Sequence, residues 1–410
     1  MKIRSITCFF DPNQSAPSIF QDLAAFSRQA KTAFEALGFE VQTTRLATTP
    51  FPTYFSGLSE SAFVAAAKSY EDRAVEAGFE YISLGCAYPD TPHFSEWIPA
   101  ALAATSQVFF SAQIASPQIG LSLPAVRACG DLIARAAPIS ADGFANLRFT
   151  ALACVPAYTP FFPASYHLGS QPAFALALEA ADLVVEAFGQ AASIAEARQS
   201  LVQKMSAVGA RLTAAAEQLS ASHAIAFKGL DFSPAPFPTD NCSLGAGIEG
   251  LGATLGLHGS LASAALLAEA LDQGDWTYAG FNGLMLPVLE DSLLARRSGE
   301  QLTLKDLLLY SAVCGTGLDT VPLPGDATPA QLSAVLLDVA ALSLRLAKPL
   351  TARLMPVPGK QAGDPTSFDF AFFANGTVMD LPAAPLNGLL ASSQESLPIR
   401  PRWSFPTRQD

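Results

Sequence analysis

Hydrophobic residues in the first part of the chain alternate between two spacings, one typical of buried strands and the other of amphipathic helices. Residues 3–10 predict a buried strand, and residues 18–37 predict an amphipathic helix. Ser18 and Gln21 have the spacing of a capping box at the start of this helix, and Gly38 ends it. The same unit recurs, with strands and helices in alternation at residues 41–46, 59–77, 81–86, 95–105, 108–114, 123–136 and 148–155.

The two spacings continue after a Pro- and Phe-rich loop at residues 160–167. A well-marked helix is predicted over residues 328–347, because Thr328 and Gln331 form a capping box around Pro329 in the first turn. Further helices are predicted at residues 172–188, 193–220, 261–271, 282–294 and 304–312, and further strands at 224–230, 318–323, 350–357 and 368–373.

This pattern predicts an α/β fold with about nine or ten strands. Strands separated by helices pair in parallel, with the helices packed outside them. No low-complexity linker divides the chain, so we expect a single large barrel domain over residues 1–396 and a loosely held tail over 397–410. Two separate domains are the alternative, because 410 residues exceed the size at which one core usually splits.

The amino-acid composition limits the kinds of molecule that the protein can be expected to bind. The chain has 24 basic and 36 acidic side chains, a net charge of -12, with 50% hydrophobic residues and only 15% charged ones. The hydrophobic content excludes intrinsic disorder. An acidic surface repels phosphate backbones and anionic lipid, so we expect no nucleic-acid or membrane partner and a small-molecule ligand instead.

The longest uncharged stretches, residues 97–126, 149–178 and 250–268, are interrupted by proline or glycine, and a membrane span needs about 20 consecutive apolar residues. Residues 1–11 lack the apolar core of a signal peptide. We therefore expect a cytoplasmic protein.

Cysteine and histidine spacing predicts neither a disulfide framework nor a metal site. The six cysteines form no CxxC pair, and the four histidines have none of the spacings of metal motifs. In a reduced compartment each cysteine is expected to be a small buried residue.

Candidate catalytic residues lie in a Gly-rich segment at residues 311–326. Cys314, Asp319 and Asp326 stand among hydroxyls and glycines between a predicted helix and a predicted strand. Loops that combine polar groups with close backbone approach commonly form sites. We assign catalytic roles to Cys314 and Asp319 and a binding role to Asp326, against the alternative of a Gly-rich turn with Asp caps.

Asp231 directly follows a predicted buried strand, a position that aims its carboxylate into a barrel mouth as a third catalytic group. An Asx-turn before Pro234 explains it equally well. We expect Asp231, Asn282 and Arg353 to converge with the residues of the 311–326 segment on one cavity.

Further binding residues are predicted at strand ends and loops. Glu290 and Asp291 are adjacent acids that can hold a divalent ion or share a proton, although surface pairing with the arginines at 296 and 297 is favoured. Arg353 and Lys360 can bind a substrate carboxylate. His167 ends the 160–167 loop, where a capping or surface role is the alternative.

Residues 245–250 match the GxGxxG pattern of dinucleotide-binding loops. The preceding predicted strand ends more than ten residues earlier, so the pattern favours a helix start packed tightly on its neighbour.

Several of these segments together resemble the uncharacterised bacterial and archaeal family known as domain of unknown function 711. The resemblance covers nearly the whole chain, and its most specific part is SAVCGTGLDTVPLPGD at residues 311–326. It implies a ten-stranded α/β barrel of the kind shared by pyruvate formate-lyase and ribonucleotide reductase, and a link to small ACT-domain proteins. The reaction of this family is not established.

Glycyl-radical enzymes on that barrel carry a C-terminal RVxG-like loop and a central thiol. The last glycine here, Gly388, has no Arg-Val before it, so a self-generated glycyl radical is not expected. Cys314 either stands in for the central thiol or is an inert buried cysteine.

The sequence favours an enzyme that acts on a small anionic metabolite inside the barrel, with no cofactor identified. A metabolite-binding regulatory partner of an ACT-domain protein, without turnover, is the alternative. Assembly of identical subunits is left open.

Overall fold

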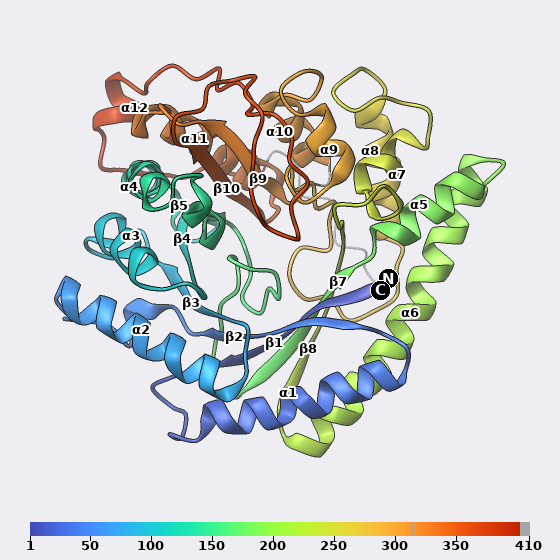
Figure 1. The fold of residues 1–410 in the computed structure, drawn as a ribbon, viewed down its shortest axis with the longest axis horizontal. Coiled ribbons are helices and arrows are strands. Elements are labelled where there is room, and N and C mark those ends of the chain that lie inside the picture. Colours follow the sequence, from blue (N-terminus) through green and yellow to red (C-terminus); the bar gives the residue numbers. More distant parts are fainter. Residues whose placement is uncertain (314, 402–410) are drawn as a thin grey trace.

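The computed structural model describes residues 1–313 and 315–401, and its centre is one mixed sheet of eleven strands. The main path of the sheet runs β8-β7-β1-β2-β3-β4-β6-β10-β9 (Figure 1). In chain order the strands are β1 (Lys2–Phe10), β2 (Val41–Thr48), β3 (Tyr81–Ala87), β4 (Val108–Ser116), β5 (Gly120–Ser122), β6 (Phe149–Ala153), β7 (Ala173–Glu179), β8 (Ala226–Ala235), β9 (Gly317–Pro324), β10 (Leu350–Val357) and β11 (Ser396–Leu397).

Two antiparallel junctions join the early strands to the late ones. β1, β2, β3, β4 and β6 are parallel to one another, as are β7 with β8 and β10 with β9. The β1–β7 and β6–β10 pairs are antiparallel. The early strands therefore form one block in the middle of the main path, and later strands flank it on both sides.

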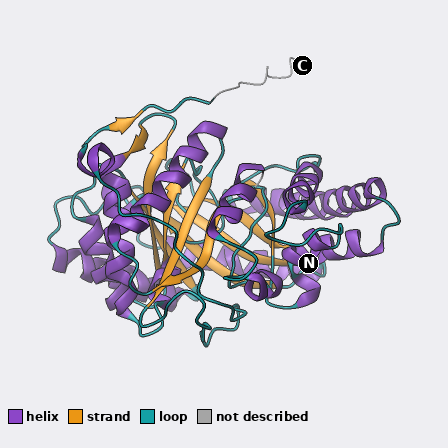
Figure 2. Cartoon of the chain, turned by 90° about the horizontal axis from the view of Figure 1, so that it is seen from above, coloured by secondary structure: helices purple, strands orange, loops and turns teal. Residues whose placement is uncertain are grey.

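Helices cover the outside of the sheet, while the strands run through the middle of the molecule (Figure 2). They are α1 (Ile19–Ala36), α2 (Glu60–Ala77), α3 (Phe94–Ala104), α4 (Leu123–Ala136), α5 (Ala181–Gln190), α6 (Ile194–His223), α7 (Leu244–Glu249), α8 (Ser260–Leu271), α9 (Ser292–Arg297), α10 (Leu304–Val313), α11 (Pro329–Leu346) and α12 (Gly388–Ser392). Short 3-10 turns lie at Phe51–Thr53, Ala137–Ile139, Phe144–Arg148 and Asp240–Cys242.

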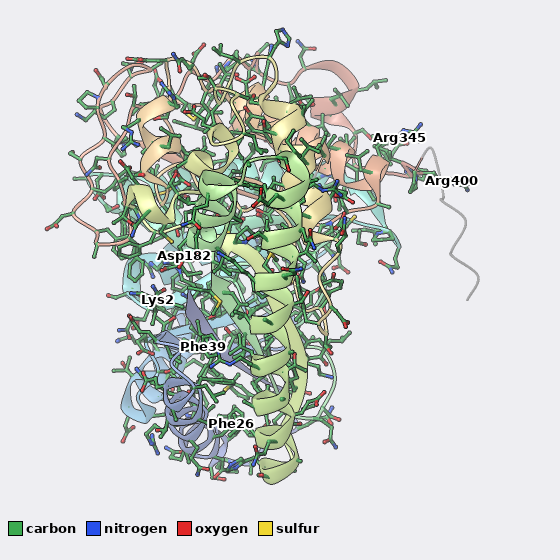
Figure 3. The ribbon with its side chains drawn as sticks, turned by 90° about the vertical axis from the view of Figure 1, so that its right-hand side faces the viewer. Lys2, Phe26, Phe39, Asp182, Arg345 and Arg400 are labelled. Atoms are coloured by element: carbon green, nitrogen blue, oxygen red, sulfur yellow. The ribbon has the colours of Figure 1, made fainter. Side chains whose placement is uncertain are left out.

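Contacts at both ends of the chain attach it to this framework. The amino group of Met1 forms an ion pair with Asp182 of α5, and Figure 3 labels Asp182 together with Lys2, which follows Met1. β11 pairs with β5, and Arg345 of α11 donates a hydrogen bond of 2.5 Å to the carbonyl oxygen of Arg400 (Figure 3).

The expected α/β class is confirmed, and so are most elements up to residue 155. The capping box at Thr328 is also confirmed, because its hydroxyl accepts the Gln331 N–H and the Gln331 side chain returns to the Thr328 N–H. The box predicted at Ser18 is wrong. Ser18 has helical dihedrals, and its hydroxyl donates to Asp22 instead.

The helix predicted over residues 172–188 is wrong in its first half, which is strand β7. Every residue of β7 is buried, because the strand lies inside the sheet between β1 and β8. Alanine favours helices in isolation, but a central strand position overrides that preference when both faces are covered.

Two further predictions are wrong in the last third of the chain. Residues 282–291 are irregular rather than helical, with isolated bridges at Leu284 and Pro287 and a turn at 288–290, and only Ser292–Arg297 is helix. Residues 368–373 form an aromatic loop instead of a strand, with contacts between Phe368, Phe370 and Phe373.

Within the described residues, α11 alone is long and apolar enough to cross a membrane by length and composition, and 44% of it is buried in the protein. It packs on α4, and buried helices of a protein core meet the same criterion.

We predict that fragments 1–222 and 223–410 cannot fold separately. The division removes the β7–β8 pairing and the antiparallel β6–β10 junction at once. Circular dichroism melts of each fragment should be broad and non-cooperative, and co-expression should restore one cooperative transition. Two independently cooperative fragments would contradict this prediction.

Candidate functional site

A cavity of about 180 Å³ lies against one face of the sheet. Residues of β1, β2, β3, β4, β6, β8, β9 and β10 line it, together with the loops that cross that face. Polar lining residues stand two apart on a strand, as with Thr43 and Arg45 or Thr351 and Arg353, because alternate side chains share one face. The wall combines four arginines and two carboxylates with aromatic rings, namely Arg4, Arg45, Arg148, Arg353, Glu290, Asp319, Tyr81, Phe109, Phe144, Phe161, Phe162, Phe281, Phe370 and Phe372.

Five buried charged side chains form a continuous series of ion pairs, called here the ion-pair chain. Arg4 contacts Glu179 at 3.2 Å and Glu290 at 2.7 Å. Arg353 contacts the other oxygen of Glu290 at 2.8 Å and Asp319 at 2.6 Å. Arg4 also lies 4.5 Å from the ring centre of Phe372. The ion-pair chain thus connects β7, β1, β10 and β9 along the cavity.

Asp319 enters the cavity at an irregularity of β9. The register between β9 and β10 shifts there, so that Asp319 and Thr320 together oppose Arg353. Thr320 has a φ of 42°, which β-branched residues rarely adopt, and its hydroxyl accepts the Leu289 N–H at 3.3 Å. Bulges of this kind re-aim side chains and occur often beside active sites.

Burial raises the pKa of Asp319, while the Arg353 guanidinium favours its charged form and the Glu290 carboxylate opposes it. A carboxyl group in a cavity with a raised pKa holds a proton more readily than an exposed one, which suits a general acid or base. The arrangement can therefore support acid–base chemistry.

Arg45 differs from the arginines of the ion-pair chain because no carboxylate of the described residues lies within ion-pair distance of it. Its only side-chain hydrogen bond within that part of the chain runs from Nε to the Thr43 hydroxyl at 2.9 Å. The guanidinium carbon lies 5.2 Å from the ring centre of Phe162 and 5.7 Å from that of Tyr81. Burial, with a smaller contribution from positive Arg4, lowers the pKa of Arg45 to about 10. Arg45 is thus a desolvated cation at the cavity wall.

Arg148 is also buried, but it has protein acceptors. It donates to the carbonyl oxygens of Leu102 at 2.6 Å and Val108 at 3.3 Å, and to the Thr105 hydroxyl at 3.1 Å. These bonds attach the turn before β6 to the end of α3, so Arg148 has a structural role that Arg45 lacks.

The structure brings three of the residues predicted from sequence to the cavity wall, namely Asp319, Glu290 and Arg353. The favoured surface pairing for Glu290 and Asp291 is wrong. Glu290 belongs to the ion-pair chain, whereas Arg296 pairs with Asp240 and Arg297 with Glu249. Asp291 caps α9, accepting the N–H groups of its first turn.

Asp231 and Asn282 contact each other just outside the lining of the cavity. The buried Asp231 carboxylate accepts the N–H groups of Phe281 at 2.7 Å, Asn282 at 3.0 Å and Ser233 at 3.1 Å. The bond from Ser233 is that of an Asx-turn, the alternative considered for this residue. This carboxylate holds the loop that carries Phe281 into the cavity wall.

The other predicted binding residues lie elsewhere. Asp326 is exposed and accepts a hydrogen bond from Gln361 at 3.3 Å. Lys360 lines a separate pocket with Asp142 and Phe368. His167 is buried between the rings of Phe9 and Tyr158. Cys314 lies outside the described residues.

The GxGxxG segment is a tightly packed helix, as favoured from the sequence. Its residues form the short helix α7, and a Cβ at Gly247 would come within 2.6 Å of the Val184 side chain. Of the five described cysteines four are buried and one half-buried, which confirms them as small interior residues. The described residues contain no group of three His, Cys, Asp or Glu side chains arranged to hold a metal ion.

The sequence reasoning missed Arg4, Arg45 and Arg148. Each interrupts an apolar strand or the turn just before one, and two of them have a threonine two positions away, as in Thr43-Thr44-Arg45 and Arg148-Phe149-Thr150. The available signal was the recurrence of polar residues at every second position of otherwise buried strands. Alternate side chains lie on the same face, so this spacing indicates that one face of the sheet is polar.

We predict that Glu290→Gln destabilises the protein by about 3 kcal/mol, because both arginines that share Glu290 lose part of their charge balance while remaining buried. Urea unfolding measures the change. Arg296→Gln, which breaks an exposed pair, is the matched control and should cost less than about 1 kcal/mol. Equal losses in the two variants would contradict a special role for the ion-pair chain.

We predict a loss of stability in acid that depends on His167. Burial lowers the pKa of His167 to about 4, below its usual 6.5, so the unfolded chain takes up this proton first. The contribution of neutral, buried His167 to the free energy of unfolding is complete above about pH 6.5. It decreases as the pH falls and is lost below about pH 4, and the total change in the free energy of unfolding is roughly 3 kcal/mol.

His167→Phe suits the aromatic surroundings and removes this titration. Unfolding midpoints at pH 7.5 and pH 5 should differ less in His167→Phe than in the wild type. His93→Gln, at an exposed histidine, should keep the wild-type difference. An unchanged pH dependence in His167→Phe would refute the assignment.

Comparison with known proteins gives the relationship of the chain. It is 31% identical over 346 residues to a UPF0210 protein of Pyrobaculum aerophilum, with 80% of this chain and 76% of the relative covered. A UPF0210 protein of Neisseria gonorrhoeae is 27% identical over 376 residues, covering 86% of this chain and 81% of the relative. Residues 1–374 match the family described as Uncharacterised ACR (DUF711), and the chain therefore belongs to that family.

Proposed function

We propose that this protein binds a small anionic metabolite in the cavity and converts it as an enzyme. Arg45 carries the proposal, because it is a buried cation whose terminal amino groups have no acceptor among the described residues. Burying an unpaired charge is costly, and an anionic ligand would remove that cost.

The charge of the wall supports the same conclusion. Four arginines line the cavity against two carboxylates, in a chain whose net charge is -12. Local positive potential inside an acidic protein attracts small anions into the cavity, while the outer surface repels large polyanions.

Asp319 is the proposed acid–base group. It lies on the cavity wall with a pKa raised by burial, and Arg353 fixes its position. A ligand anchored at Arg45 would lie in the same cavity as this carboxyl group. Groups that supply proton transfer typically contribute 10²- to 10⁴-fold to a rate.

We further propose that the sheet closes into a barrel like that of pyruvate formate-lyase and ribonucleotide reductase, in a cytoplasmic protein. Isolated bridges support closure, because they join Leu230 of β8 to Tyr278, and Leu284 and Pro287 to the β9 region. Residues 278–288 would then fill the place between the two free edges of the main path.

Arg45→Met tests the binding role. Methionine keeps the volume and removes the charge, so the ligand-free variant should be as stable as the wild type or more stable. Thermal-shift screening with small acids should find ligands that stabilise the wild type and lose most of that effect in Arg45→Met. Arg148→Met is the matched control and should lower the melting temperature, because it leaves buried carbonyl groups unpaired.

Product analysis with the ligands found then tests turnover. Asp319→Asn should keep ligand binding and lower any turnover at least 100-fold. Stabilisation without conversion would refute the enzyme and favour a regulatory protein, such as a partner of an ACT-domain protein. Undiminished ligand binding by Arg45→Met would refute the proposal as a whole.

A further inference from the structure

We infer that the ligand of this cavity is a monocarboxylic acid with an aromatic or similarly apolar body. The inference rests on the proposed function and specifies the substrate class of the same site. Three features of the wall carry it: its charge balance, the two unpaired terminal amino groups of Arg45, and its aromatic rings.

Charge balance favours a single negative charge. Glu179 does not line the cavity, but it pairs with Arg4 and is therefore counted with Glu290 and Asp319. The site then holds four arginines and three carboxylates. One cation is in excess. A carboxylate neutralises it, whereas a phosphate monoester brings about 1.5 to 2 negative charges and would leave the site negative.

The geometry of Arg45 fits a carboxylate. Its Nε is occupied by the Thr43 hydroxyl, so the free edge of the fork is the pair of terminal amino groups. Two parallel N–H groups match the two oxygens of a carboxylate. The rings of Tyr81 and Phe162 flank the guanidinium and limit its movement.

The body of the ligand meets mainly aromatic surface. The Phe109 ring contacts those of Tyr81 and Phe162, at 5.3 and 5.2 Å between centres, beside Arg45. Phe144 and Phe370 contribute a second ring pair at 5.1 Å. An engineered cavity of roughly 150 Å³ admits benzene, so about 180 Å³ leaves room for one ring and a short acid arm.

Two threonines of the wall have their hydroxyl protons bound to backbone carbonyl groups. Thr43 donates to the Arg4 carbonyl oxygen at 2.8 Å, and Thr351 donates to the Thr316 carbonyl oxygen at 3.2 Å. Neither hydroxyl therefore has a proton free to donate to a ligand, and recognition of the acid rests on Arg45 and the rings.

A matched set of probes tests the inference by titration calorimetry on the full chain: 3-phenylpropionate, propionate, 3-phenylpropan-1-ol and glucose 6-phosphate. We expect 3-phenylpropionate to bind at least about tenfold more tightly than each of the others, because it alone combines one charge with a buried ring. Arg45→Met should remove binding of both carboxylates.

Phe162→Leu should weaken 3-phenylpropionate severalfold and leave propionate unchanged. Tyr278→Leu, an exposed aromatic outside the cavity, is the control and should change neither.

Equal affinity for propionate and 3-phenylpropionate would overturn the apolar body and leave the anion site standing. Tighter binding of glucose 6-phosphate, lost in Arg45→Met, would overturn the monocarboxylate and again leave the proposed function. If none of the four binds at millimolar concentration, the inference fails, and other acids that respond to Arg45→Met would still support the proposed function.

Discussion

The ion-pair chain is the constraint on which the rest of this structure depends. Four of its five members come from β1, β7, β9 and β10, Glu290 lies in the turn at 288–290, and all five are buried. A one-residue slip of β1 would turn Arg4 to the other face and leave Glu179 and Glu290 without their shared cation. The charges therefore set the register of the strands around them. They also keep this face of the sheet polar, whereas apolar side chains in their place would pack together and fill the cavity.

The same region shows how stability and binding oppose each other. Arginines in the ion-pair chain are matched by carboxylates, and Arg148 by carbonyl groups, so their burial is compensated within the fold. Arg45 is left without such a match, and the bulge at Thr320 adds an unusual backbone conformation beside Asp319. Features that cost stability in the free protein commonly collect where a ligand acts.

Local patterns predicted the elements well because caps and periodicity are properties of neighbouring residues, as at Thr328 and Gln331. They failed for β7, where the surrounding strands decide the conformation of an Ala-rich segment. The site was recovered only in part. Glu290 was expected to pair with the arginines that follow it, but its partners are Arg4, 286 residues away, and Arg353, 63 residues away. Such pairing is set by topology, which spacing along one sequence does not encode.

The position of β1 also has a consequence for the order of synthesis. Among the strands of this sheet β1 is synthesised first, yet it lies inside the sheet between β2 and β7. Glu290 follows Arg4 by 286 residues, a delay of roughly 15 to 60 seconds at usual elongation rates. During that interval the partners within reach of Arg4 are water, Gln42 and, once β7 has emerged, Glu179. A hydrated arginine on the nascent strand opposes premature collapse of this face, so the late strands meet an inner surface that is still open.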